Sequence, residues 1–141
     1  MLSAFLSHAN YWALLVSALV YFALGSLWFS ALFGKIWSAE VAKHGVVIKD
    51  PSKKDISSKM LQTFICNVIA VLSIGYLVFV TGTSNWMAGL KLGLLCGIGF
   101  ATVGIFIAYT WESRSLKLLM IDCGYAIVGM GLAGIILSVW H

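Results

Sequence analysis

Long stretches without charge are the feature that most constrains the fold of this chain. No Asp, Glu, Lys or Arg occurs in residues 1–34, 60–90 or 92–111. A chain of 141 residues is too small to bury all three stretches in one water-solvated core, whereas the hydrocarbon of a bilayer can solvate them. Charged residues make up 10% of the chain, compared with about 25% in soluble domains. We therefore expect an integral membrane protein whose first partner is the lipid bilayer.

Four segments are long enough to cross a bilayer as helices, because a spanning helix takes about 20 mainly apolar residues. They cover residues 11–33, 60–80, 90–109 and 116–140. Continuous runs of this length favour helices over the short alternating strands of a membrane barrel. The prediction is an all-α, polytopic membrane protein, a single domain over residues 1–141 with four transmembrane helices in an antiparallel up-down bundle.

The distribution of Lys and Arg predicts which way the chain threads, because cytoplasmic loops carry an excess of both. The loop at residues 35–59 holds six lysines, and Arg114 and Lys117 flank the last link, whereas the opposite side holds only Lys91. We therefore expect both termini outside the cytoplasmic (inner) membrane of a bacterium and the basic loop inside the cell. The net charge of +4 is confined to these loops and gives no reason to expect a nucleic-acid partner.

The basic loop also predicts local structure. Ile36 and Trp37 are expected on the apolar side of a short interfacial helix, with Glu40 on its polar side. Gly45 is expected to end that helix, because glycine readily adopts the backbone conformation that follows a helix. The Asp-Pro pair at residues 50–51 predicts the start of the next helix.

Small residues in the last two spans predict where helices pack closely, since lipid is as apolar as leucine and helices associate through close contact. The predicted packing glycines are Gly93, Gly97 and Gly104 in the third span and Gly124, Gly129 and Gly131 in the fourth. The small residues of the fourth span fall on two faces, and Ile121 and Tyr125 belong to a bulky side between them that is expected to face lipid. Two packing faces predict either a central position for this helix or a seam between copies of the chain.

Asp122 is the one carboxylate well inside a predicted span, about 8 Å past Lys117 along the helix. A carboxylate at that depth is costly, so it needs partners within the bundle. We expect Arg114 to reach toward it and Asn67 or Thr63 to donate hydrogen bonds, which makes Asp122, Arg114 and Asn67 a candidate intramembrane polar site. Such a group either handles a proton or ion or serves as a structural carboxylate near the interface.

Motifs for catalysis or cofactor binding are missing from the sequence. It has no haem attachment, zinc-protease, nucleophile or phosphate-loop motif. Cys66, Cys96 and Cys123 all lie within predicted spans without metal-ligand spacing, so we expect them to pack as small apolar residues. We expect no catalytic residue, no metal, no cofactor and no enzymatic activity.

Two stretches of sequence carry a family resemblance. Residues 25–37 read Gly-Ser-Leu-Trp-Phe-Ser-Ala-Leu-Phe-Gly-Lys-Ile-Trp, and residues 111–125 read Trp-Glu-Ser-Arg-Ser-Leu-Lys-Leu-Leu-Met-Ile-Asp-Cys-Gly-Tyr. They resemble the domain of unknown function 1761 family of small bacterial membrane proteins. The chain departs from that pattern at Ala31, where the family has Pro, and at Ala126, where it has His. The resemblance implies four spans and a basic first loop, and it implies no activity.

These observations leave two functional hypotheses. The first is a non-enzymatic membrane protein that works through helix packing, as a homo-oligomer or as an accessory subunit of a larger membrane complex. The alternative is a small transporter or channel in which Asp122 is the proton- or ion-handling carboxylate.

Overall fold

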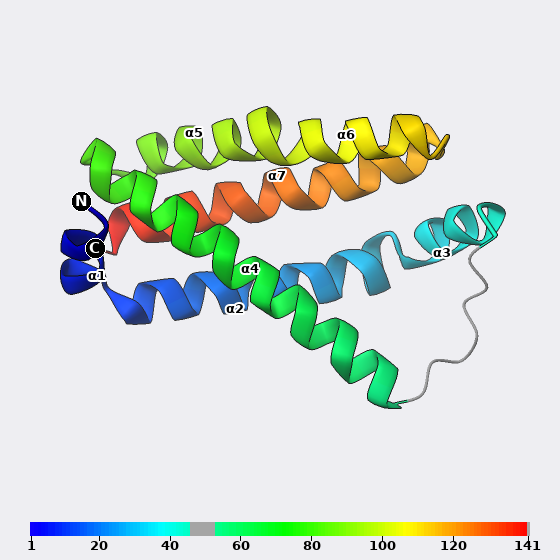
Figure 1. The fold of residues 1–141 in the computed structure, drawn as a ribbon, viewed down its shortest axis with the longest axis horizontal. Helices are drawn as coiled ribbons and strands as arrows, with labels where there is room; N and C mark the ends of the chain where they lie inside the picture. The colour runs from blue at the N-terminus through cyan, green and yellow to red at the C-terminus, as the bar shows by residue number, and fades with distance from the viewer. Residues whose placement is uncertain (46–52, 141) are drawn as a thin grey trace.

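A computed structural model describes residues 1–45 and 53–140, and the predicted all-α class is confirmed because these residues form helices joined by short links. The elements, of which Figure 1 labels the α-helices, are α1 (Leu2–His8), α2 (Tyr11–Leu27), the π-helical turn η1 (Trp28–Leu32), α3 (Gly34–Lys43), α4 (Lys53–Thr81), α5 (Trp86–Cys96), the π-helical turn η2 (Gly97–Ala101), α6 (Thr102–Trp111) and α7 (Leu116–Val139). The helix start predicted at residues 50–51 lies outside the described residues.

Four of the helical stretches are long and apolar enough to cross a membrane, which confirms the predicted number of spans. They are Tyr11–Leu32, Asp55–Thr81, Trp86–Trp111 and Leu116–Val139. The second span begins at Asp55, earlier than predicted, because polar residues precede the apolar part of the same helix. The third begins at Trp86, also earlier than predicted, because Asn85 caps the helix there. Helix α1 has no counterpart in the prediction.

Polar side chains mark where three of the spans begin. Asn10, Asn85 and Ser115 each accept a hydrogen bond from a backbone amide in the first turn of α2, α5 and α7. The first amides of a helix have no partner within the helix, so such caps satisfy groups that would otherwise be costly in a membrane. Each cap therefore sets the residue at which its span begins.

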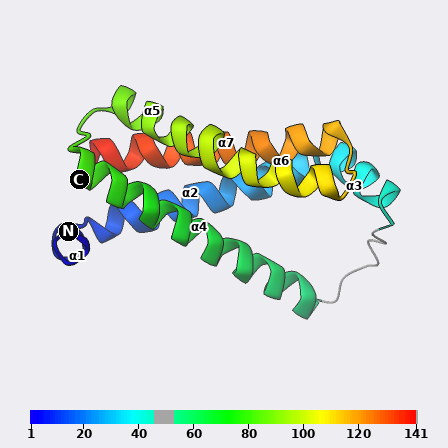
Figure 2. The same ribbon diagram turned by 45° about the horizontal axis from the view of Figure 1, so that its top comes forward.

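Helix α7 is the centre of the bundle. It packs against α5 on one side and against α2 and α4 on the other (Figure 1). The first half of α4 diverges from the other helices in both views (Figures 1 and 2). We call the end that holds α1 and the last turn of α7 the α1 end, and the end that holds α3 the α3 end.

The contact between α5 and α7 is made by glycines. A Cβ added at Gly93 would collide with the carbonyl oxygen of Met130, and one added at Gly97 would lie 2.9 Å from the Cα of Ile127. Gly131 is buried in the same seam against leucines of α5. The two backbones approach so closely only because these positions carry no side chain, as the glycine spacing predicted.

The other small face of α7 receives aromatic side chains from the first span. A Cβ at Gly129 would collide with the ring of Tyr21, and one at Gly124 would lie 2.9 Å from Cζ2 of Trp28. Both small faces of α7 are therefore filled within one chain. The structure supports a central position for this helix without requiring a seam between copies.

The prediction that the bulky side of α7 faces lipid is wrong at two positions. Ile121 is buried, and its carbonyl oxygen accepts a hydrogen bond from Nε1 of Trp28 at 3.0 Å. Tyr125 packs against the rings of Tyr21 and Phe29 at centroid distances of 5.1 and 5.2 Å. Large rings of α2 and η1 reach past the small face of α7 and cover these neighbours, which a helical wheel of α7 alone does not show.

Helix α3 forms where a short helix was predicted, but it is rotated about its axis. Glu40 is only 5% exposed, whereas Ile36, expected on the apolar side, is 50% exposed. The Glu40 carboxylate turns inward because it bonds Lys43 at 2.8 Å and the Ser115 hydroxyl. Gly45 follows the helix with a φ of +75°, in the left-handed conformation that suits glycine.

Candidate functional site

Asp122 lies in the second turn of α7 and is held by two donors from other elements. Its Oδ1 accepts a hydrogen bond from Nε1 of Trp37 on α3 at 3.2 Å. Its Oδ2 accepts a hydrogen bond from the hydroxyl of Tyr109 on α6. One carboxylate thus joins three helices at the α3 end.

The structure gives Arg114 and Asn67 other direct partners. The Arg114 guanidinium bonds the carboxylate of Glu112 and stacks 5.0 Å from the ring centroid of Tyr109. Asn67 is 5% exposed, and its Nδ2 donates to the hydroxyl of Tyr125 at 3.2 Å. Each residue therefore contacts a tyrosine of the site and makes no direct hydrogen bond with Asp122. In the case of Asn67, the longer side chain of Tyr125 covers a distance that the Asn67 side chain does not.

Thr63 also has another partner than the one we expected. Its hydroxyl donates to the carbonyl oxygen of Lys59, one turn back on the same helix, at 2.9 Å. Hydroxyls on membrane helices commonly bond the preceding turn in this way. The donors to Asp122 are instead an indole and a phenol, residue types that sequence patterns mark as interfacial anchors.

Beside Asp122 lies a pocket of about 520 Å³, formed by α2, η1, α6 and α7. Four aromatic side chains line it together with the carboxylate: Tyr21, Phe29, Tyr109 and Tyr125. Gly104 lines it as well, and a Cβ added there would meet no described atom within 4 Å. Gly104 thus provides space instead of the helix contact predicted for it, because the π-turn η2 changes the face that α6 presents to α7.

The rings beside the pocket form a continuous series that ends at the carboxylate. The Tyr21 ring lies 5.1 Å from that of Tyr125, Tyr125 lies 5.2 Å from Phe29, and Phe29 lies 5.6 Å from Trp37. These distances are typical of favourable aromatic pairs. The series makes one wall of the pocket rigid and presents ring edges and faces to it.

The carboxylate has no ion-pair partner in the part of the chain that the structure describes. The ion pairs found there join Glu40 with Lys43 and Glu112 with Arg114. Asp122 is partly exposed, and the exposed part faces the pocket. A carboxylate has about four acceptor positions, so two hydrogen bonds leave it able to bind another donor or a cation.

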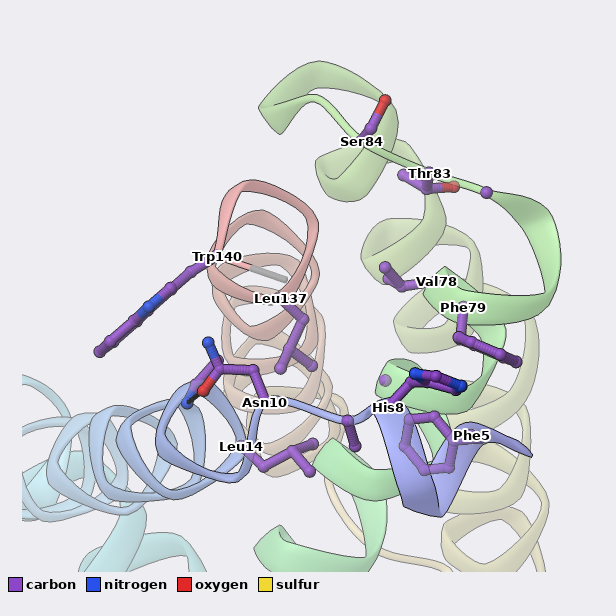
Figure 3. Close-up of a pocket in the computed structure, with 14 residues that line it drawn as sticks. Phe5, His8, Asn10, Leu14, Val78, Phe79, Thr83, Ser84, Leu137 and Trp140 are labelled. Carbon is purple, nitrogen blue, oxygen red and sulfur yellow. Dashed lines mark hydrogen bonds between the residues drawn. The ribbon is translucent and has the colours of Figure 1, made fainter. Parts of the chain in front are cut away.

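A second pocket, of about 230 Å³, lies at the α1 end (Figure 3). Phe5, Val78, Phe79 and Leu137 give it an apolar wall, and His8, Thr83 and Ser84 stand at its rim. Asn10 also lines it, but the oxygen of that side chain caps α2. Few free polar groups remain, so its chemistry is less specific than that of the Asp122 pocket.

The described residues contain no group of three or more His, Cys, Asp or Glu that could hold a metal ion. Cys66, Cys96 and Cys123 are free thiols. Chemistry at the Asp122 pocket therefore has to be argued from one carboxylate, three phenols and the rings around them.

Comparison with known proteins places the chain in a family. The family model described as "Protein of unknown function (DUF1761)" matches residues 12–138, which extend from the start of α2 almost to the end of α7. No curated protein and no solved structure matches the chain. The chain therefore belongs to this family of proteins of unknown function.

Proposed function

We propose that this protein is a small, non-enzymatic transporter or channel in which Asp122 handles a proton or ion. One observation carries the proposal: a carboxylate inside a membrane-spanning helix, without an ion-pair partner among the described residues, lines a pocket of about 520 Å³. Ionisable groups at such depth are costly, and they mark ion and substrate pathways more often than they support a fold.

A buried hydroxyl between the two pockets, that of Ser17, supports a route along the bundle. Leu14 lines the pocket at the α1 end and Tyr21 lines the Asp122 pocket, and both lie on one face of α2. Ser17 lies between them on that face and is 1% exposed. Its hydroxyl is buried without a hydrogen-bond partner among the described residues, as expected for a group that a transient water would reach.

Alternating access would require the Asp122 pocket to open in turn toward each side of the membrane, and a packed layer now separates it from the pocket at the α1 end. Between Leu14 and Tyr21, the layer consists of side chains such as Val71, Ile74 and Ala133, all at most 2% exposed. Transport through this layer would need α2 or α4 to move against α7. A further pocket of about 340 Å³, lined by Phe22 of the first span and by Met60 and Thr63 of α4, lies between these helices.

Proton movement in proteoliposomes tests the proposal. Vesicles that enclose a pH-sensitive dye should acidify after an imposed pH step only when they contain the wild-type protein. Asp122→Asn should abolish this flux, whereas Asp55→Asn, which neutralises an exposed carboxylate outside the pocket, should leave it unchanged. Equal flux in the wild type and in folded Asp122→Asn would count against the proposal.

The second candidate function is an accessory or homo-oligomeric membrane subunit. It is favoured by the diverging part of α4, where Met60, Leu61 and Ile65 are 48–60% exposed and could meet another protein as well as lipid. The mass of the detergent-extracted particle separates the two functions. A constant partner or a fixed multiple of the 15.3 kDa chain would support this candidate, and a monomer would oppose it.

A further inference from the structure

We propose that the Asp122 pocket binds a lipophilic organic cation, that is, an ammonium or phosphonium group carried on an apolar body. The proposal rests on the proposed function and names the class of substrate. It draws on three properties of the pocket: its charge, its aromatic wall and its size.

The charge of the pocket selects a cation. Asp122 is the only formally charged residue among those that line it. The charge of Arg114, in the link between α6 and α7, acts on Asp122 but is shared with Glu112 and with the ring of Tyr109. An anion would meet no positive charge in the lining itself, whereas a cation would neutralise the carboxylate in a medium of low dielectric constant.

The aromatic wall selects an organic cation. Tyr21, Phe29, Tyr109 and Tyr125 contribute four rings to a single pocket. The face of an aromatic ring attracts a positive charge, and this attraction is the usual means by which proteins hold quaternary ammonium groups. A small metal ion would need oxygen ligands, and Asp122 is the only carboxylate in the lining.

The size of the pocket agrees with this class of ligand. The pocket is a shallow, open depression, and its volume of about 520 Å³ allows it to cover one side of a drug-sized molecule while the other side meets lipid. Gly104 contributes to this volume because its side is open to the pocket. The remaining lining residues, Ile105, Ala108 and Ala126, are apolar and suit the hydrocarbon part of such a ligand.

The cation could be a dissolved compound or the amine head of a membrane lipid such as phosphatidylethanolamine. The recognition chemistry is the same for both, since each presents a positive nitrogen next to an apolar body. The composition of the bilayer around the purified protein distinguishes them. Competition by the lipid would weaken binding of a probe in nanodiscs of phosphatidylethanolamine relative to nanodiscs of an uncharged glycolipid without an amine, and a dissolved ligand would give equal binding in both, because the two surfaces carry no net charge.

Binding of tetraphenylphosphonium to the full-length protein in nanodiscs tests the proposal. Quenching of tryptophan fluorescence should report saturable binding, because Trp37 adjoins the pocket. Asp122→Asn should weaken the affinity about tenfold or more, since it removes the opposing charge. Tetraphenylborate, which has the same shape and the opposite charge, should not compete.

Two further variants keep the test decisive if Asp122→Asn does not fold. Gly104→Leu would fill the pocket without meeting a described atom at its Cβ, and it should weaken binding about tenfold or more. Gly99→Leu, on η2 outside the lining, is the matched control and should bind like the wild type. Binding that is unchanged in Gly104→Leu, or that tetraphenylborate displaces equally well, would overturn the proposal.

These outcomes are separable from those for the proposed function. Asp122-dependent proton flux without phosphonium binding would overturn the ligand class and leave the transporter function standing. Phosphonium binding without flux would support the ligand class and count against transport.

Discussion

At the scale of single residues, Tyr109 and Trp37 share one carboxylate and come from helices on different sides of it. The phenol belongs to α6 and the indole to α3, so their hydrogen bonds hold two peripheral helices against α7. A hydrogen bond to a charged acceptor contributes more than one between neutral groups. The α3 end of the molecule therefore depends on Asp122 for its packing as well as for its chemistry.

Tyr109→Phe should destabilise the protein by about 1.5–3 kcal/mol, because it removes a hydrogen bond to a carboxylate and leaves the ring in place. Tyr11→Phe is the matched control, since the Tyr11 hydroxyl bonds the carbonyl oxygen of Leu6 at an exposed position. The midpoint of thermal unfolding in detergent measures both variants. Equal midpoints for the two would show that the bond to Asp122 contributes nothing to stability.

Sequence patterns could not identify these partners. Trp37 lies 85 residues from Asp122, and Tyr109 lies across the link between α6 and α7. Both residues carry a large ring at the end of an apolar run, which is also the position of an interfacial anchor. Only the three-dimensional packing shows that their polar atoms turn inward, whereas the depth of Asp122 alone was enough to mark it as part of a site.

At the scale of the helices, the glycines of the third span have two different roles. Gly93 allows the backbone of α5 to contact α7. Gly104, which follows the π-turn η2, lines the open pocket beside Asp122 instead. A π-turn adds a residue to one turn of helix, so side chains after it face a different direction from that of an unbroken helix. The third span contains no proline, so its sequence gives no sign of such a turn. The stripe of small residues therefore appeared continuous.

Alanine at the two glycines should have opposite effects. Gly93→Ala should destabilise the protein by about 1–3 kcal/mol, because its Cβ would collide with the Met130 carbonyl. Gly104→Ala should leave stability unchanged or raise it by up to about 1 kcal/mol, since alanine favours the helix and its Cβ meets no described atom within 4 Å. Unfolding in mixed detergent and denaturant measures both, and a similar loss in the two variants would contradict the assigned roles.

Glu40 is a buried carboxylate on α3, so the stability of the α3 end should depend on pH. The hydrogen bond from Lys43 lowers the pKa of the Glu40 carboxyl below its ordinary value of 4.5, and the Ser115 hydroxyl and the charge of Lys117 act in the same direction. This contribution to stability is present above pH 4.5 and is lost as the pH falls through the lowered pKa of the folded protein.

The difference in thermal midpoint between the wild type and Glu40→Gln measures this contribution. We expect a constant difference above pH 4.5 that shrinks as the pH is lowered further. Ser38→Ala, which alters an exposed hydroxyl on the same helix, serves as the control and should show no such trend. A difference that does not change with pH would show that ionisation of Glu40 contributes nothing to the stability of the protein.

At the scale of the whole molecule, the number and length of the spans were predictable because they depend only on the length of the uncharged runs. The arrangement of the helices around α7 was predictable in part, since two small faces imply two neighbours. The pocket was not predictable, because it brings side chains of the first span together with side chains of α6 and α7, which lie far along the sequence from it.

The orientation predicted from Lys and Arg can be tested with single cysteines in a background that lacks Cys66, Cys96 and Cys123. A membrane-impermeant maleimide added to intact cells should label Ser84→Cys at the α1 end and should not label Gly45→Cys at the α3 end. Permeabilised cells provide the control, since both sites should then react. Labelling of Gly45→Cys alone in intact cells would reverse the predicted topology.

The central position of α7 also bears on biosynthesis. This helix is synthesised after the other three spans, yet each of them packs against it. The earlier spans must therefore enter the bilayer before a shared neighbour exists, and until then the Asn67 amide lacks the hydroxyl of Tyr125 that it bonds in the finished bundle. A chain that stops before residue 116 should consequently be recognised as unfinished by membrane quality-control proteases, even though three of its four spans have been inserted.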